Sequence, residues 1–188
     1  MKKLFIILTI GLILGACTKE EVGVYSLGND YIYMPYNQSI YGTMTTPDTV
    51  YMFYNSSPLT VSSTQKRDTF YFKVLVAGLA KNVDRKIKIE PYSCDISYKE
   101  DAVAGVNYVA FDDPEMEKHL VIPANSLESE IPIIVTYDQA IAGQYKSFAV
   151  KFKLVESEDF KLLGVNSDLT AGNSARTHAY VQFTQVSW

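Results

Sequence analysis

Cysteine and histidine are scarce in this 188-residue sequence, and their scarcity excludes several kinds of chemistry. There are two cysteines, Cys17 and Cys94, and two histidines, His119 and His178, which lie far apart and outside any H-E-x-x-H pattern. These residues have no metal-ligand spacing. The sequence also lacks a G-x-S-x-G motif and a glycine-rich phosphate loop. We therefore expect no metal, no cofactor and no nucleophile elbow.

Long apolar runs are also missing, apart from eleven residues at Leu4–Leu14. As a helix of ~1.5 Å per residue this run would reach about 16 Å, short of the roughly 30 Å hydrocarbon core, so it does not suit a transmembrane anchor. It follows Lys2 and Lys3 and precedes the small residues Gly15 and Ala16. Basic, apolar and small segments in this order predict a signal peptide, residues 1–16.

The end of this leader reads LGAC, residues 14–17. This stretch resembles the bacterial lipobox, in which a cysteine just past the cleavage point accepts a diacylglycerol. The resemblance implies cleavage between Ala16 and Cys17 and acylation of Cys17; the alternative is an ordinary secretory cut beside an incidental cysteine. Because each buried methylene contributes ~0.8 kcal/mol, two or three acyl chains would hold the protein on a membrane without spanning it.

Three charged residues, Lys19, Glu20 and Glu21, follow the cysteine closely. They resemble the short export tag that sends lipoproteins of Bacteroidetes-type bacteria to the outer face of the outer membrane. The alternative is that these residues belong to a solvated tether and carry no sorting signal. The resemblance implies a lipid-anchored protein that faces the cell exterior.

Charge argues against nucleic acid as a partner. Removal of the leader takes away Lys2 and Lys3 and leaves 172 residues with 15 basic and 21 acidic side chains, a net charge of −6 with the amine acylated. An acidic chain lacks the basic surface that phosphates need. Cys94 then has no internal disulfide partner, and we interpret it as a small core residue rather than a nucleophile.

Strand-forming residues dominate the rest of the chain, with 14 Tyr, 9 Phe and many Val, Ile and Thr. In Ser147–Val155, Phe148, Val150, Phe152 and Leu154 alternate with residues that we expect to face water. No long amphipathic helix competes. The sequence therefore predicts an all-β fold, an antiparallel sandwich of immunoglobulin type. The predicted strands are residues 50–54, 69–76, 86–90, 108–111, 120–122, 131–137, 147–155 and 178–185.

Four stretches of the middle region, AGVNY (104–108), VIPANS (121–126), IPIIV (131–135) and SFAVKFKL (147–154), resemble the strand and turn signatures of Calx-beta-like sandwiches. They look most like the versions in Bacteroidetes outer-membrane lipoproteins, a family without assigned activity. Gly105 and the corner at Pro123–Asn125 are expected turns. Calcium-binding relatives carry an aspartate where Asn107 stands here, so calcium is not predicted. We expect residues 17–47 to form a lipidated tether that leads into a first strand or two, and residues 48–188 to form the sandwich.

Two residue classes remain as candidates for a function. The acidic clusters 112–115 and 156–159 could hold a glycosidase carboxylate pair, but both are typical of solvated turns, so we predict no catalytic residue. Tyrosines crowd the N-terminal third, and exposed tyrosines can stack on sugar rings while their hydroxyls form hydrogen bonds. Tyr36 and Tyr41, in the expected loop PYNQSIYG, are the candidate ligand-binding residues; the alternative is that they pack in the core.

Three functions follow from these expectations. The first is a non-catalytic surface lipoprotein that binds a polysaccharide or assists an outer-membrane nutrient-uptake transporter. The second is a structural or adhesive subunit, which would need a strand exchanged between chains, such as the one before Trp188. The third is a hydrolase with an unrecognised carboxylate pair.

Overall fold

The computed structural model describes residues 28–35, 40–45, 50–163 and 176–187. Almost all regular structure in these ranges is strand. The elements are β1 (Tyr31–Tyr33), β2 (Tyr41–Thr45), β3 (Tyr51–Asn55), β4 (Leu59–Val61), β5 (Arg67–Ala77), β6 (Arg85–Lys86), β7 (Lys88–Pro91), β8 (Glu100–Asp101), α2 (Pro114–Glu117), β9 (Val121–Ile122), β10 (Glu128–Thr136), η1 (Gln139–Ile141), β11 (Lys146–Val155), β12 (Lys161–Leu162) and β13 (His178–Gln185).

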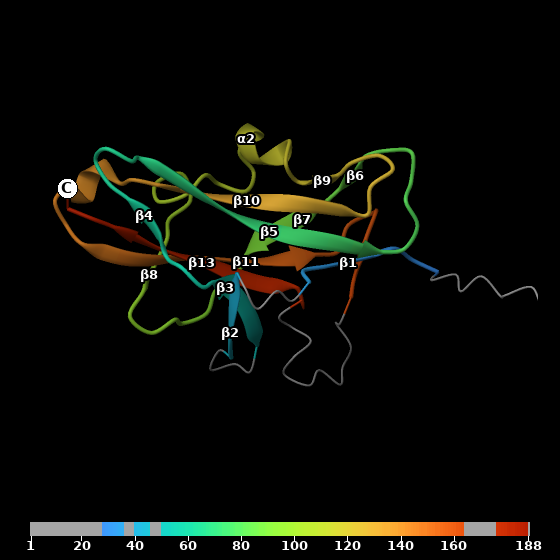
Figure 1. The fold of residues 1–188 in the computed structure, drawn as a ribbon, viewed down its shortest axis with the longest axis horizontal. Helices are drawn as coiled ribbons and strands as arrows, with labels where there is room; N and C mark the ends of the chain where they lie inside the picture. Colours follow the sequence, from blue (N-terminus) through green and yellow to red (C-terminus); the bar gives the residue numbers. More distant parts are fainter. Residues whose placement is uncertain (1–27, 36–39, 46–49, 164–175, 188) are drawn as a thin grey trace, which may run out of the picture.

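Two sheets pack face to face, one above the other in Figure 1. The four-stranded sheet has the order β10-β5-β1-β12. The seven-stranded sheet has the order β2-β3-β13-β11-β7, with β4 beside β13 and β8 beside β11, and a separate pair joins β6 to β9. The all-β sandwich prediction is therefore confirmed.

The four-stranded sheet is built on the long antiparallel pair of β5 and β10, from Glu128 opposite Leu75 to Thr136 opposite Arg67. Alternation in β5 buries Phe72, Val74 and Val76, as period two requires. β10 carries a proline, Pro132, inside a nine-residue strand. Proline cannot donate to a ladder, and β10 is the edge strand of its sheet, where that loss is tolerated.

The seven-stranded sheet is centred on β13, which pairs antiparallel with β11 from Lys146 opposite Gln185 to Lys153 opposite His178. On its other side β13 pairs parallel with both β3 and β4. β8 and β12 also form parallel pairs, with β11 and β1. The expectation of purely antiparallel sheets is therefore wrong, because short N-terminal strands and loop segments add to the antiparallel centres.

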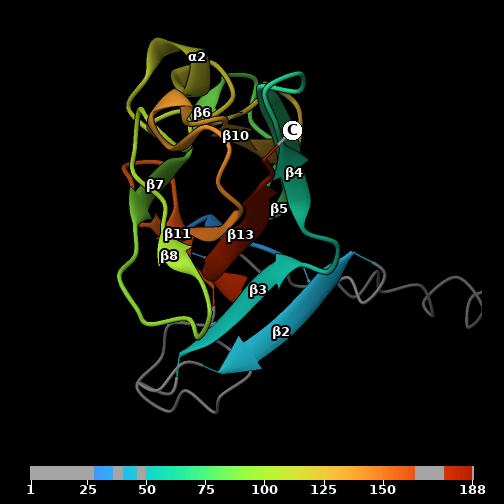
Figure 2. The same ribbon diagram turned by 90° about the vertical axis from the view of Figure 1, so that its left-hand side faces the viewer.

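The segment assigned to the tether and a first strand contributes to both sheets. β1 pairs with β5 and places Ile32 in the core, 1% exposed. β2 forms a hairpin with β3, with Tyr41 opposite Asn55. Figure 2 shows this hairpin extending beyond the body of the sandwich.

The expected strand at 108–111 does not form. Tyr108 makes only isolated bridges, to Ala104 and to Val135. The preceding turn is the expected one: Gly105 has φ 74°, and its N–H donates to the carbonyl of Tyr108 at 2.8 Å. The corner at Pro123–Asn125 is also a turn, since Asn125 has φ 62° and Ser126 N–H donates to the Pro123 carbonyl. A hydrogen-bonded loop with isolated bridges therefore lies beside β10, where the sequence predicted a strand.

A second, smaller core lies on the outer face of the seven-stranded sheet. It consists of Met52, Cys94, Ile96, Ala149 and Tyr180. Ala149 and its neighbour Lys151 were expected to face water, but they are 2% and 7% exposed because the segment 93–101 covers them. The expectation that this face of β11 is exposed to water is therefore wrong.

No helix in the described ranges is both long and apolar enough to cross a membrane.

Candidate functional site

Most of the residues that the sequence singled out lie outside the described part of the chain. These are Ala16, Cys17, Lys19, Glu20, Glu21 and Tyr36. Tyr41 is described, and it does not lie in an exposed loop: it begins β2 and is 3% exposed. Its ring stacks between Phe53 and Phe72 at centroid distances of 5.4 and 5.3 Å, and its hydroxyl accepts a hydrogen bond from Lys73 N–H at 3.0 Å.

Burial raises the pKa of the Tyr41 hydroxyl, as expected for a phenol inside the core. A ring enclosed by two phenylalanines cannot stack on a ligand. The expectation that Tyr41 binds a glycan is therefore wrong, and the alternative of a packed core residue is correct.

The two acidic clusters serve local structure. Asp113 caps α2, where its Oδ1 accepts from Glu115 N–H at 2.7 Å, and Glu115 pairs with Arg67 at 2.8 Å. In the other cluster, Asp159 accepts from Lys86 N–H at 2.8 Å. Glu156 accepts from the Lys161 ammonium at 2.7 Å, and this hydrogen bond lowers the pKa of its carboxyl. A lowered pKa is opposite to what a general acid needs.

Cys94 is buried, as expected, and its Sγ lies 3.7 Å from the sulfur of Met52. The His178 ring packs edge-on against Tyr92 at 4.7 Å, and its Nδ1 lies 2.9 Å from Thr177 Oγ1. Within the described ranges, no group of three or more His, Cys, Asp or Glu side chains is placed to hold a metal ion.

An exposed aromatic pair that the sequence analysis did not identify forms the best candidate site. Tyr98 is 99% exposed and Tyr145 is 69% exposed. Both line an open, shallow cleft of about 710 Å³, together with Asp95, Ile96, Ser97, Lys99, Glu100, Lys146 and Ser147. We refer to it as the tyrosine cleft.

Tyr98 projects from a tight turn. Lys99 N–H donates to the Ile96 carbonyl at 3.2 Å, so Tyr98 is the third residue of a four-residue turn, and its φ is 65°. A positive φ at this position is the pattern of a type II turn, which favours glycine. A tyrosine in this conformation carries a backbone strain of about 1–2 kcal/mol, with no packing of its ring to compensate.

The loop that carries Tyr98 is fixed from below by the smaller core. Cys94 and Ile96 are 8% and 6% exposed, and both pack on the outer face of the seven-stranded sheet. The buried Lys151 ammonium donates to the Cys94 carbonyl and pairs with Asp101 at 2.5 Å. These contacts hold both ends of the loop, so the exposed ring stands on a rigid base.

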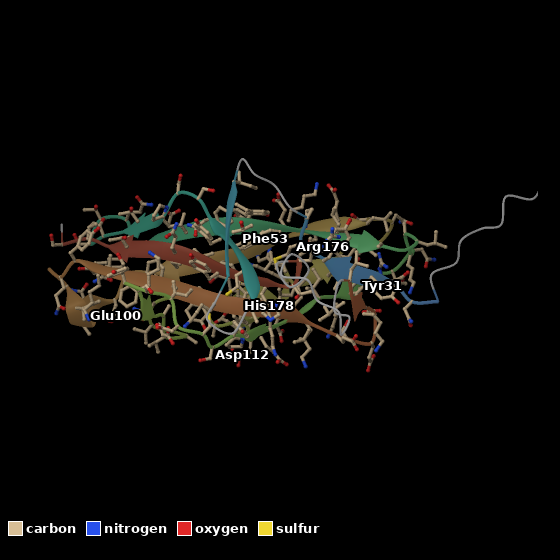
Figure 3. The ribbon with its side chains drawn as sticks, turned by 90° about the horizontal axis from the view of Figure 1, so that it is seen from below. Tyr31, Phe53, Glu100, Asp112, Arg176 and His178 are labelled. Atoms are coloured by element: carbon tan, nitrogen blue, oxygen red, sulfur yellow. The ribbon has the colours of Figure 1, made fainter. Side chains whose placement is uncertain are left out.

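Charges in the cleft are balanced. Lys146 donates to both carboxylate oxygens of Glu100, at 2.8 and 2.9 Å. The remaining charged residues, Asp95 and Lys99, have opposite signs. The cleft therefore presents two phenol rings and several hydrogen-bonding groups without a net charge, and Figure 3 shows Glu100 toward one end of the elongated molecule.

No sequence signal would have identified this site. Cys94, Ile96 and Tyr98 alternate, and period two predicts all three on the buried face. The positive φ at Tyr98 breaks that pattern, and the turn contains no glycine, proline or asparagine from which it could be predicted. Tyr145 precedes β11 and lines the same cleft as Tyr98 because β8 pairs with the start of β11.

Comparisons of the chain with protein-family models, with curated proteins and with solved structures found no match.

Proposed function

We propose that this protein is a non-catalytic lipoprotein of the bacterial cell surface that binds a neutral glycan at the tyrosine cleft. The observation that carries the proposal is Tyr98, a fully exposed ring held on a strained backbone. Strain of this kind persists where the surrounding structure fixes it, and it is concentrated at ligand sites. Glycine would adopt this backbone conformation without strain. We therefore infer that the tyrosine side chain at this position has a role of its own.

Two tyrosines on one open cleft suit a sugar chain. A phenol ring offers a flat apolar face to a pyranose ring while its hydroxyl forms hydrogen bonds. The loop of Tyr98 is already ordered by Ile96 and Lys151, so binding loses little conformational entropy. Because the charges of Lys146 and Glu100 satisfy each other, the cleft favours a neutral sugar over a uronic or sulfated one.

The lipid anchor and the location on the cell surface are proposed from the sequence. The lipobox-like stretch ending at Cys17 supports acylation, and Lys19–Glu21 supports display on the outer face of the outer membrane. A surface protein that captures a polysaccharide would serve an outer-membrane nutrient-uptake transporter as an accessory. We also propose that the sandwich is of the Calx-beta-like immunoglobulin type, which its four sequence signatures support.

Affinity electrophoresis of the lipoprotein in detergent, in gels containing neutral polysaccharides such as β-glucan, xylan or mannan, tests the proposal. At least one gel should retard the protein and leave the polysaccharide chain length unchanged. Loss of one stacking ring costs on the order of 1 kcal/mol, so Tyr98→Ala and Tyr145→Ala should each weaken binding about fivefold, and the double variant tenfold or more.

Tyr71→Ala is the matched control, because Tyr71 is 51% exposed on β5 and does not line the cleft. It should bind as the unmodified protein does. Equal weakening by Tyr71→Ala, or full retardation of the double variant, would remove the tyrosine cleft from the proposal. Release of reducing ends by the purified protein would replace binding with hydrolysis.

A further inference from the structure

Apolar side chains are exposed at the end of the sandwich where the described chain begins. Leu79 is 75% exposed, Val83 is 54% exposed and Leu127 is 39% exposed. Leu79 and Val83 lie in the loop between β5 and β6, and Leu127 precedes β10. A contiguous exposed apolar patch marks a place of interaction, and the hydrogen bonds described next hold these two loops together. We call these three residues the apolar tip.

The apolar tip is held in a fixed arrangement. Arg85 is fully buried, and its guanidinium donates to the carbonyls of Leu79 at 3.5 Å and Ser126 at 3.1 Å. Asn125 N–H donates to the Lys81 carbonyl at 2.6 Å. The two loops are therefore tied to each other and to the core through their backbones.

The chain enters the sandwich beside the apolar tip. Gly28, Asn29 and Asp30 line one cavity of about 270 Å³ with Leu79 and Lys81. The Asp30 carboxylate bonds Lys81 at 2.8 Å and Arg85 at 3.1 Å. The segment before β1 is thus fixed to the same loops that carry the exposed side chains, and Figure 1 shows β1 and the β5–β6 loop at the same end of the molecule.

The length of chain before Gly28 limits how far this end can lie from a lipid anchor. Ten residues lie between Cys17 and Gly28, so the two are eleven Cα–Cα steps apart. Fully extended, at about 3.5 Å per step, this stretch reaches no more than about 38 Å. The opposite end of the sandwich lies roughly 30 Å further away, which is the length of the nine-residue strand β10.

We propose that the apolar tip rests on the membrane surface, with Leu79, Val83 and Leu127 in contact with the interfacial region of the lipid. The inference rests on the proposed acylation of Cys17. A short tether brings the tip to the bilayer, and transfer of its exposed apolar surface out of water favours contact. The tyrosine cleft, whose Glu100 lies toward the end opposite Tyr31 in Figure 3, then points away from the membrane.

Site-directed fluorescence in vesicles tests this contact. The lipidated protein is reconstituted into phosphatidylethanolamine–phosphatidylglycerol vesicles that contain brominated lipid, after labelling with a thiol-reactive bimane at Leu79→Cys or Val83→Cys. Cys94 is 8% exposed and Cys17 would be acylated, so the unmodified protein should take little label. Ala142→Cys, in the exposed loop before β11 at the opposite end, is the matched control.

Brominated lipid should quench the bimane at positions 79 and 83 by about twofold and leave position 142 unchanged, since only the tip reaches the interface. No quenching at 79 and 83 in protein that floats with the vesicles would overturn the proposal while leaving the anchor intact. Protection of both positions from aqueous iodide without quenching by lipid would also overturn it and would indicate a protein partner. Failure to float with the vesicles would refute the anchor itself, and with it the membrane contact.

Discussion

Replacement of Tyr98 by glycine should separate stability from binding. The φ of 65° at Tyr98 costs a non-glycine residue about 1–2 kcal/mol. Glycine removes this strain, but the unfolded chain gains about 0.5–1 kcal/mol of conformational freedom. The ring is 99% exposed, so its removal loses no packing. The free energy of unfolding of Tyr98→Gly should therefore rise by about 0.5–1 kcal/mol.

Equilibrium unfolding in urea measures this gain. With an m-value of about 2 kcal/mol/M, the midpoint should rise by roughly 0.3–0.5 M at unchanged slope. The same variant should bind the glycan at least as weakly as Tyr98→Ala, because the stacking ring is gone. A more stable protein that has lost its ligand is the expected outcome.

Two matched variants isolate the cause. Tyr98→Asn should gain part of the stability, since asparagine tolerates a positive φ better than tyrosine does. Tyr145→Gly should lose about 0.4–1 kcal/mol, because Tyr145 is not among the residues with positive φ and glycine there only frees the unfolded chain. A lower urea midpoint for Tyr98→Gly would refute the strain argument, and undiminished glycan binding by that variant would refute the site.

Three further predictions concern the anchor and the buried charges. Cys17→Ala should abolish incorporation of labelled fatty acid and release the protein from membranes; normal labelling would contradict acylation at this residue. Asp30→Asn should lower the free energy of unfolding by on the order of 3 kcal/mol, because the buried Arg85 loses its counter-ion. Burial raises the pKa of Asp30, but the Lys81 ammonium, a backbone hydrogen bond from Leu79 and the Arg85 guanidinium outweigh it and lower the pKa below 3.8. The wild type should therefore lose this stabilisation as the pH falls below that value, and acid unfolding curves of Asp30→Asn should lack that loss. Lys151→Met should weaken glycan binding, because the Cys94 carbonyl and the Asp101 carboxylate lose the donor that they share and the loop that carries Tyr98 is released. Glycan binding equal to that of the wild type would show that the loop does not need these hydrogen bonds.

Strands with strict alternation could be predicted from the sequence. The stretch 178–185 matches β13 at both ends, and 147–155 matches β11 within one residue. Short strands such as β8 and β12 could not be predicted, because two residues carry no period and form only when a neighbouring strand is present. The burial of Lys151 could not be predicted either, because it depends on a covering segment more than fifty residues away in the sequence.

The candidate site could not be predicted for a related reason. Tyr41 belongs to a stretch with the composition of a loop, yet pairing with β3 draws it into the core. Tyr98 belongs to an apparent strand pattern, yet one positive φ turns it to solvent. Residue type indicated that a tyrosine could bind a sugar, but backbone geometry decided which tyrosine is exposed.

The position of β13 in its sheet has a consequence for the order of folding. Its partners β3 and β4 come from residues 51–61, more than a hundred positions earlier in the chain. Until residues 178–185 are available, those early strands have no neighbour on that side, and β11 lacks its longest pairing. Closing such distant pairs is slow compared with local pairing. A chain still being synthesised would therefore keep β3, β4 and β11 without these pairings until residues 178–185 have left the ribosome, so the seven-stranded sheet closes late.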